Sequence, residues 1–77
     1  MAHSPSPLRI ARLLQGRSLD EIAPTAELSA SFLSRVERGF AFISPESVGR
    51  VAGAYRVSRD AVAPAVRRGP RAAGRGR

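Results

Sequence analysis

The sequence lacks most of the residues on which metal centres and acid–base catalysis depend. It has no cysteine, so neither a disulfide framework nor a thiolate metal site can form. His3 is the single histidine, and it lies in the N-terminal lead-in. The six acidic residues are scattered, and no glycine-rich phosphate loop is present. We therefore expect no enzymatic activity, no metal, no cofactor and no small-molecule ligand.

Long apolar runs are also absent. The longest uninterrupted apolar stretches hold only a few residues, far short of the roughly 20 that a membrane span needs. The segment from Met1 to Pro7 has neither the basic region nor the apolar core of a signal peptide. These features favour a soluble cytoplasmic protein that does not associate with a membrane.

The charge that is present is basic and unevenly distributed. The 77 residues carry 13 arginines and no lysine against 6 acids, which gives a formal net charge of +7. Residues 67–77 contain five of these arginines and no acid, whereas residues 1–66 contain eight arginines against six acids. A basic excess of this kind favours a polyanionic partner, nucleic acid before an anionic membrane surface.

Serine residues divide the chain into five short predicted helices. A serine side chain accepts an orphan amide at a helix N-terminus, and glycine with positive φ commonly ends a helix. Ser44 followed by Pro45 is the strongest N-terminal signal, and Ser18 with Glu21 forms a capping box. The helices are expected to begin after Ser6, Ser18, Ser29, Ser44 and Ser58, with Gly16 ending the first and Gly39 the third.

Apolar residues recur at helical spacing, and no segment alternates with the period of a strand. The expected fold class is all-α, a compact bundle of five short helices. Residues 1–6 are expected to be a flexible N-terminus, residues 7–66 the domain, and residues 67–77 an Arg/Gly-rich tail that is disordered when free. The inner side chains are expected to be Leu8, Ala11, Leu14, Phe32, Leu33, Val36, Val48, Val51, Ala52, Tyr55, Ala61, Val62 and Val66.

The connection between the third and fourth predicted helices is unusually apolar. It contains Phe40, Phe42 and Ile43. Ile43 is expected to fill the core. Phe40 and Phe42 could do the same, or one of them could lie on a surface that joins two subunits.

Two predicted helices joined by a tight turn occupy residues 18–38. In a helix-turn-helix the second helix lies in the DNA major groove, and residues near its N-terminus contact base edges. Any small helical bundle contains a similar pair, so this spacing alone favours DNA binding only slightly.

Particular segments make the case stronger. Residues 31–39 read Ser-Phe-Leu-Ser-Arg-Val-Glu-Arg-Gly, residues 21–23 read Glu-Ile-Ala, and residues 8–12 read Leu-Arg-Ile-Ala-Arg. Through these segments, residues 8–62 resemble the phage-repressor/Cro-like helix-turn-helix family, often called the XRE family. The resemblance runs along these residues without a gap. The family's third helix commonly ends Ser-Tyr-Leu-Ser-Arg-Ile-Glu-Arg-Gly. The resemblance implies a lambda-repressor-like fold and a transcriptional regulator that binds double-stranded DNA. A homodimer is expected, because a single recognition helix contacts too few base pairs for useful specificity.

The resemblance also implies roles for single residues. Of the residues expected at base edges, only Arg35 can make a bidentate contact, for which guanine is the usual target. Arg12 and Glu37 occupy the places of an ion pair between the first and third helices. Base contacts are expected from Ala30, Ser31, Ser34 and Arg35. Phosphate contacts are expected from Arg17, Ser29 and Arg38. Outside the resemblance, the basic tail could add phosphate contacts through Arg67 and Arg68. For Arg17 and Arg38 a solvated surface position is the alternative, and the tail could be only a solubilising extension. Arg35 could instead pair with a neighbouring residue. Ser31 and Ser34 could be solvated, and Ser29 could serve only as a cap.

Three positions depart from the family pattern. Leu19 stands where the family commonly has a glutamine that bonds a phosphate. Glu27 stands in the turn where glycine is usual, so it must adopt a left-handed conformation at some cost, or the turn must differ. Pro24 is expected to interrupt the second helix. The fold should survive these changes, but DNA affinity would depend on arginines elsewhere.

Three functions are therefore compared. The first is a sequence-specific DNA-binding transcriptional regulator that uses the helix at about 30–38 in the major groove. The second is a protein-interaction module of the same fold that binds the transcription machinery or a partner regulator. The third is a non-specific nucleic-acid binder that works through residues 67–77. We favour the first, with the second as the alternative.

Overall fold

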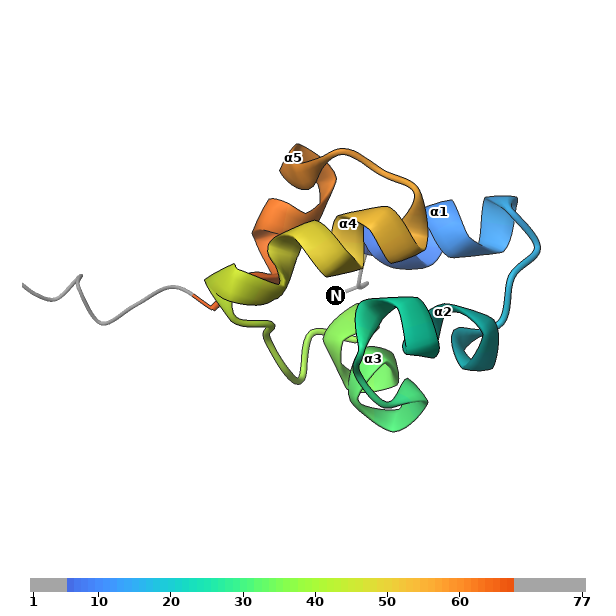
Figure 1. The fold of residues 1–77 in the computed structure, drawn as a ribbon, viewed down its shortest axis with the longest axis horizontal. Coiled ribbons are helices and arrows are strands. Elements are labelled where there is room, and N and C mark those ends of the chain that lie inside the picture. The colour runs from blue at the N-terminus through green and yellow to red at the C-terminus, as the bar shows by residue number, and fades with distance from the viewer. Residues whose placement is uncertain (1–5, 68–77) are drawn as a thin grey trace, which may run out of the picture.

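The computed structural model describes residues 6–67, and within them the chain is helical (Figure 1). The one extended feature of these residues is a parallel bridge between Ile43 and Val66. The elements are α1 (Pro7–Leu14), α2 (Leu19–Ala26), α3 (Ala30–Glu37), the 3₁₀ helix η1 (Pro45–Ser47), α4 (Val48–Tyr55), α5 (Arg59–Val62) and the 3₁₀ helix η2 (Ala63–Ala65). The predicted all-α class and the five helices are confirmed.

α4 occupies the centre of the bundle. It packs against α2 on one side and against α5 on the other, and α1 contacts both α4 and α5. In Figure 1, α2 and α3 lie below α4 and α5 lies above it. Each of the five α-helices contributes to the buried core, which comprises Leu8, Ile22, Ala26, Leu33, Val36, Ile43, Val51, Ala52, Ala54, Tyr55 and Val62. The expectation that Ile43 fills the core is confirmed.

Four of the five predicted serine caps form as expected. The hydroxyls of Ser6, Ser18, Ser29 and Ser58 each accept a hydrogen bond from the backbone N–H three residues later. The capping box is complete, because Oε1 of Glu21 accepts from the Ser18 backbone N–H at 2.8 Å. These caps satisfy amides that would otherwise have no partner within the helix.

Ser44 behaves differently from the other four serines. Its hydroxyl lies 3.1 Å from the hydroxyl of Ser47 and bonds no helix amide, and the chain first forms the 3₁₀ turn η1. The α-helix therefore begins at Val48, three residues later than the cap signal predicted.

The prediction that Pro24 interrupts α2 was wrong. The helix continues through Pro24 to Ala26. Pro24 is the sixth residue of the helix, so its missing N–H removes one bond near the C-terminal end, where little helix follows. Glu27 then takes the left-handed conformation (φ 60°, ψ 36°) and ends α2 without glycine.

α1 presents a different inner face from the one expected. Leu14 is 84% exposed, although its spacing from Leu8 and Ala11 placed it inside. Leu14 lies six residues after Leu8. Because a helix has 3.6 residues per turn, six residues place the Leu14 side chain about 120° away from the face that holds Leu8. The face toward the bundle instead passes from Leu8 through Ala11 and Arg12.

None of the helices described is long and apolar enough to cross a membrane.

Candidate nucleic-acid interface

α3 has one buried and one outward-facing stripe. Leu33, Val36 and Glu37 are buried against the bundle. Positions i, i+3, i+4 and i+7 form a single line along a helix. On α3 and its C-cap this outward line is Ser31, Ser34, Arg35 and Arg38, of which Ser34 is half-buried and the others are exposed. Three of the four residues expected at base edges therefore share one face, and Ala30, half-buried, begins the helix.

Both arginines of this stripe stack on phenylalanine rings. The guanidinium of Arg35 lies 5.9 Å from the centroid of Phe32, one turn earlier on α3. The guanidinium of Arg38 lies 5.6 Å from the centroid of Phe40, and its Nε donates to the Ser34 carbonyl at 3.3 Å. Cation–π contacts of this kind restrict where a flexible guanidinium can point. The two charges therefore have preferred positions before any ligand arrives.

The C-terminal end of α3 is fixed to the bundle through Glu37. Its Oε2 accepts from Nε of Arg12 at 2.9 Å and from the Tyr55 hydroxyl at 2.7 Å, and its Oε1 accepts from Nη2 of Arg12 at 2.9 Å. The side chains of Arg12 and Glu37 are 11% and 1% exposed. Nη1 of Arg12 also donates to the Arg17 carbonyl at 3.1 Å. One carboxylate thus joins α1, α3 and α4.

The protonation of this network follows from its geometry. The hydrogen bond to Glu37 raises the pKa of Arg12, against an opposing effect of desolvation, so the guanidinium stays charged. Burial, reinforced by the hydrogen bond to Glu37, raises the pKa of Tyr55 well above its ordinary value, so the phenol stays neutral and donates. Both oxygens of the buried carboxylate accept hydrogen bonds from these donors, which makes it a structural group rather than a ligand for DNA.

The N-terminal end of α3 is held by a second set of contacts. The Ser29 hydroxyl accepts from the Phe32 backbone N–H at 3.0 Å, so it acts as the cap of α3. Nε of Arg50 donates to the Ala26 carbonyl at 3.3 Å and lies 3.6 Å from Glu27 Oε1. Arg50 therefore links α4 to the turn between α2 and α3.

The arginines expected to contact phosphate occupy different settings. Arg38 is exposed beside the C-terminal end of α3, and Arg67 is exposed at the last described position, where its backbone N–H donates to Ile43 at 2.7 Å. Arg17 is half-buried, and its Nη1 donates to the Ala54 carbonyl at 2.7 Å, so this side chain ties the α1–α2 connection to α4. Arg68 and the rest of the tail lie outside the described residues.

The N-terminal end of α2 lacks a ready phosphate contact. Leu19 packs against the core, Asp20 is exposed at the first turn, and Glu21 is part of the capping box. Two carboxylates at this end complement the helix dipole but repel a phosphate. Any phosphate contacts must come from other parts of the surface.

Some contributors to the site were not predicted from the sequence. Tyr55 was expected only in the core, yet its hydroxyl completes the Glu37 network. Phe32 and Phe40 were considered as apolar residues and not as supports for arginines. The Phe32–Arg35 spacing of three residues is a sequence signal that could have found the first pair.

Comparison with known proteins gives one match. The family model described as a helix-turn-helix domain matches residues 7–65, which is most of the chain and includes all five helices. No curated protein and no solved structure is significantly similar to the chain.

Proposed function

The chain belongs to the helix-turn-helix domain family, and we propose that it is a sequence-specific transcriptional regulator whose helix α3 lies in the major groove of DNA. Membership of this family indicates a DNA-binding regulator at a general level. The observation that supports base contacts by α3 is its polar outer stripe, Ser31, Ser34, Arg35 and Arg38, opposite a buried apolar face. A helix whose apolar face is buried in this way presents polar side chains that can form hydrogen bonds in a DNA groove.

Each residue of the stripe has a proposed role. Arg35 bonds O6 and N7 of a guanine, since the bidentate guanidinium contact matches that base edge. Ser31 and Ser34 bond a base or a phosphate, and Ala30 contacts a thymine methyl group. Arg38 bonds a phosphate from the C-terminal end of the helix. Arg67, and Arg68 beyond the described residues, add phosphate contacts, whereas Arg17 and Ser29 have structural partners.

The proposed regulator acts as a homodimer. An eight-residue recognition helix contacts only a few base pairs, and specificity in a genome requires more of them. Two copies related by a two-fold axis would place their α3 helices in successive major grooves, about 34–36 Å apart. The expected operator is therefore an inverted repeat.

The test of base contacts is the substitution Arg35→Ala with Arg56→Ala as its matched control. Arg56 is exposed at the end of α4 and is not part of the α3 stripe, so both variants lose one positive charge. Loss of a bidentate base contact costs about 1–3 kcal/mol, which is roughly 5- to 150-fold in affinity. Arg35→Ala should lose this much on its own operator and no more than Arg56→Ala on random DNA. Equal losses on the two DNAs would contradict base contact by Arg35.

A second function has support from α1. Its side chains Ile10, Leu13 and Leu14 are 44%, 54% and 84% exposed and share one outer face at i, i+3 and i+4. An unpartnered apolar stripe is typical of a protein-contact surface. In this alternative the domain binds the transcription machinery or a partner regulator.

Capture of partners from cell extract distinguishes this alternative. A partner retained after nuclease treatment and at high salt, and lost with Leu13→Ser, would support it. Retention of the same partners by Leu13→Ser would exclude this stripe as the contact.

A further inference from the structure

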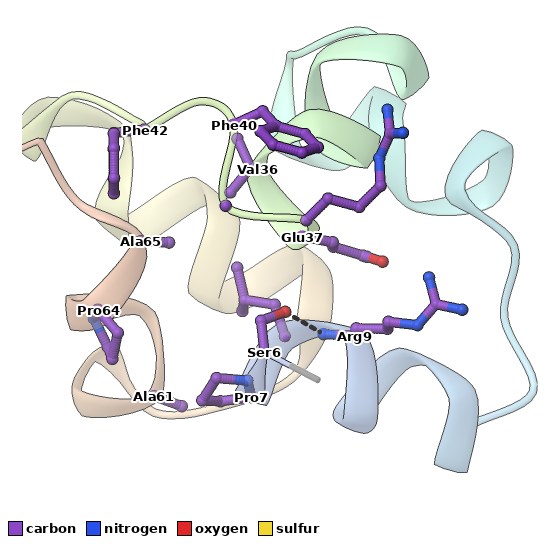
Figure 2. Close-up of a pocket in the computed structure, with 13 residues that line it drawn as sticks. Ser6, Pro7, Arg9, Val36, Glu37, Phe40, Phe42, Ala61, Pro64 and Ala65 are labelled. Atoms are coloured by element: carbon purple, nitrogen blue, oxygen red, sulfur yellow. Dashed lines mark hydrogen bonds between the residues drawn. The ribbon is translucent and has the colours of Figure 1, made fainter. Parts of the chain in front are cut away.

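A groove of about 510 Å³ borders the C-terminal end of the α3 stripe, with which it shares Arg38 (Figure 2). Its walls come from the N-terminal end of α1, the C-terminal end of α3 with its following connection, and α5 with η2. A groove of this volume lies within the range of small-molecule sites in proteins. From the sequence alone no small-molecule ligand was expected.

The two ends of the groove differ in chemistry. Figure 2 shows Phe42, Pro64 and Ala65 at one end and Arg9 at the other. Phe42 is 52% exposed, so its ring is accessible. Arg38 lines the same groove and stacks on Phe40. The groove is therefore an apolar channel with guanidinium groups beside it.

The positive charge of this groove is not neutralised by the protein within the described residues. Glu37 also lines it, but its carboxylate is bonded to Arg12 and Tyr55. The only other ion pair of residues 6–67 joins Arg50 and Glu27. Arg9 and Arg38 both line the groove and thus have no acidic partner within residues 6–67.

We propose that this groove binds a monocarboxylate with an unbranched apolar chain of medium length. The carboxylate lies at the end with Arg9 and Arg38, and the chain extends toward Phe42 and Pro64. Charge-assisted hydrogen bonds fix the head, and burial of the chain supplies the remaining affinity. A second copy of this protein fits less well, because a two-fold contact through this face would bring the same arginines of both protomers together.

This site has a consequence for DNA binding, and that consequence rests on the proposed function. Arg38 is the proposed phosphate contact, and the carboxylate would occupy the same guanidinium. Binding of the two anions is then mutually unfavourable, so the carboxylate lowers affinity for DNA and DNA lowers affinity for the carboxylate by the same factor.

The first experiment measures ligand binding by the full chain without DNA. Decanoate and decyltrimethylammonium, each below its micelle concentration, and decanol, below its solubility limit, are titrated and followed by backbone amide NMR and calorimetry. Decanoate should bind, with shifts at the walls of the groove. Decanol should bind about tenfold more weakly because it lacks the charge-assisted bonds, and decyltrimethylammonium should not bind there.

Matched variants locate the site. Arg9→Gln and Phe42→Ser should each weaken decanoate binding about tenfold. The controls are Arg56→Gln, which makes the same change, and Leu14→Ser, which also replaces an apolar side chain by serine. Both lie at exposed positions outside the groove and should leave the affinity unchanged. All four side chains are at least half exposed or on the surface, and circular dichroism checks that each variant is folded.

Several results would overturn the proposal. These are the absence of decanoate binding, equal affinity for decanol, shifts centred on Leu13 and Leu14, or equal losses in test and control variants.

The DNA consequence is tested separately by titrating decanoate into a preformed DNA complex. If decanoate binds the free protein but does not displace DNA, the regulatory role is refuted and the binding site is not. If the protein binds no DNA, the proposed function fails, and the titration without DNA still decides the groove.

Discussion

The substitution Glu37→Gln removes the charge from the carboxylate that joins three helices. In the native chain that carboxylate accepts hydrogen bonds from two nitrogens of Arg12 and from the hydroxyl of Tyr55. Glutamine keeps the size of the side chain but offers one oxygen in place of two, and its amide N–H groups face other donors. Arg12, whose side chain is only 11% exposed, then keeps a positive charge with no counter-ion beside it.

The expected loss of stability is large for a domain of this size. Removing one partner of a buried ion pair costs about 3–5 kcal/mol, because the other charge is left buried and uncompensated. At about 0.05–0.15 kcal/mol per residue, a chain of 77 residues has a free energy of unfolding of roughly 4–12 kcal/mol. Glu37→Gln therefore removes a large part of the total, and it unfolds the chain if its stability is near the lower limit.

The assay is urea denaturation followed by circular dichroism, with Glu27→Gln as the matched control. Glu27 forms the other ion pair, at 3.6 Å to Arg50, with side chains 69% and 40% exposed. Exposed pairs contribute about 0–1 kcal/mol, so this control should change little. In Arg12→Met/Glu37→Gln the uncompensated charge is gone, and this double variant should be more stable than Glu37→Gln alone. A loss below about 1 kcal/mol for Glu37→Gln, or no recovery in the double variant, would refute the reasoning.

Further predictions concern pH, the turns and α3. Because burial raises the pKa of Tyr55, the contribution of this residue to the free energy of unfolding is fully present below about pH 10 and falls above it, by up to about 1.4 kcal/mol per pH unit. Denaturation of Tyr55→Phe at a series of pH values should lack this fall, and a pH profile identical to that of the native chain would contradict the prediction. Glu27→Gly and Arg56→Gly relieve the backbone strain of left-handed conformations at φ 60° and 58°, so each should raise the free energy of unfolding by up to about 1 kcal/mol. A lowered melting temperature would count against strain at these caps. Phe32→Leu keeps an apolar side chain but removes the ring under Arg35, so competition assays should show roughly two- to fivefold less preference for the operator over random DNA. An unchanged preference would show that the Phe32 ring does not position Arg35 for base contact.

The helices could be predicted because their signals are local. A serine hydroxyl and the amide three residues later are close whatever the rest of the chain does, so four of the five caps formed as the sequence indicated. The predicted cap at Ser44 did not form, because the nearby Ser47 hydroxyl supplied a different hydrogen-bond partner. The prediction that Leu14 faces inward was wrong, because the inner face of a two-turn helix depends on how the helix packs against the bundle.

The site could be predicted only in part, for the same physical reason. Helical spacing alone puts Ser31, Ser34 and Arg35 on one face of α3, so this grouping was available from the sequence. The third donor to Glu37 comes from Tyr55, eighteen residues away along the chain, and only packing brings it there. The groove beside Arg9 and Phe42 combines residues from both ends of the domain, and no local pattern indicates it.

The central claim, that α3 contacts a defined DNA sequence, is tested most directly by selecting bound DNA from a random pool. The full-length protein is used at about physiological salt, where non-specific attraction between arginines and phosphates is reduced. The account predicts recovery of a defined inverted repeat with guanines at equivalent positions in its two half-sites, and loss of that preference with Arg35→Ala. Recovery of no motif from a folded protein would contradict the claim and favour the protein-interaction alternative.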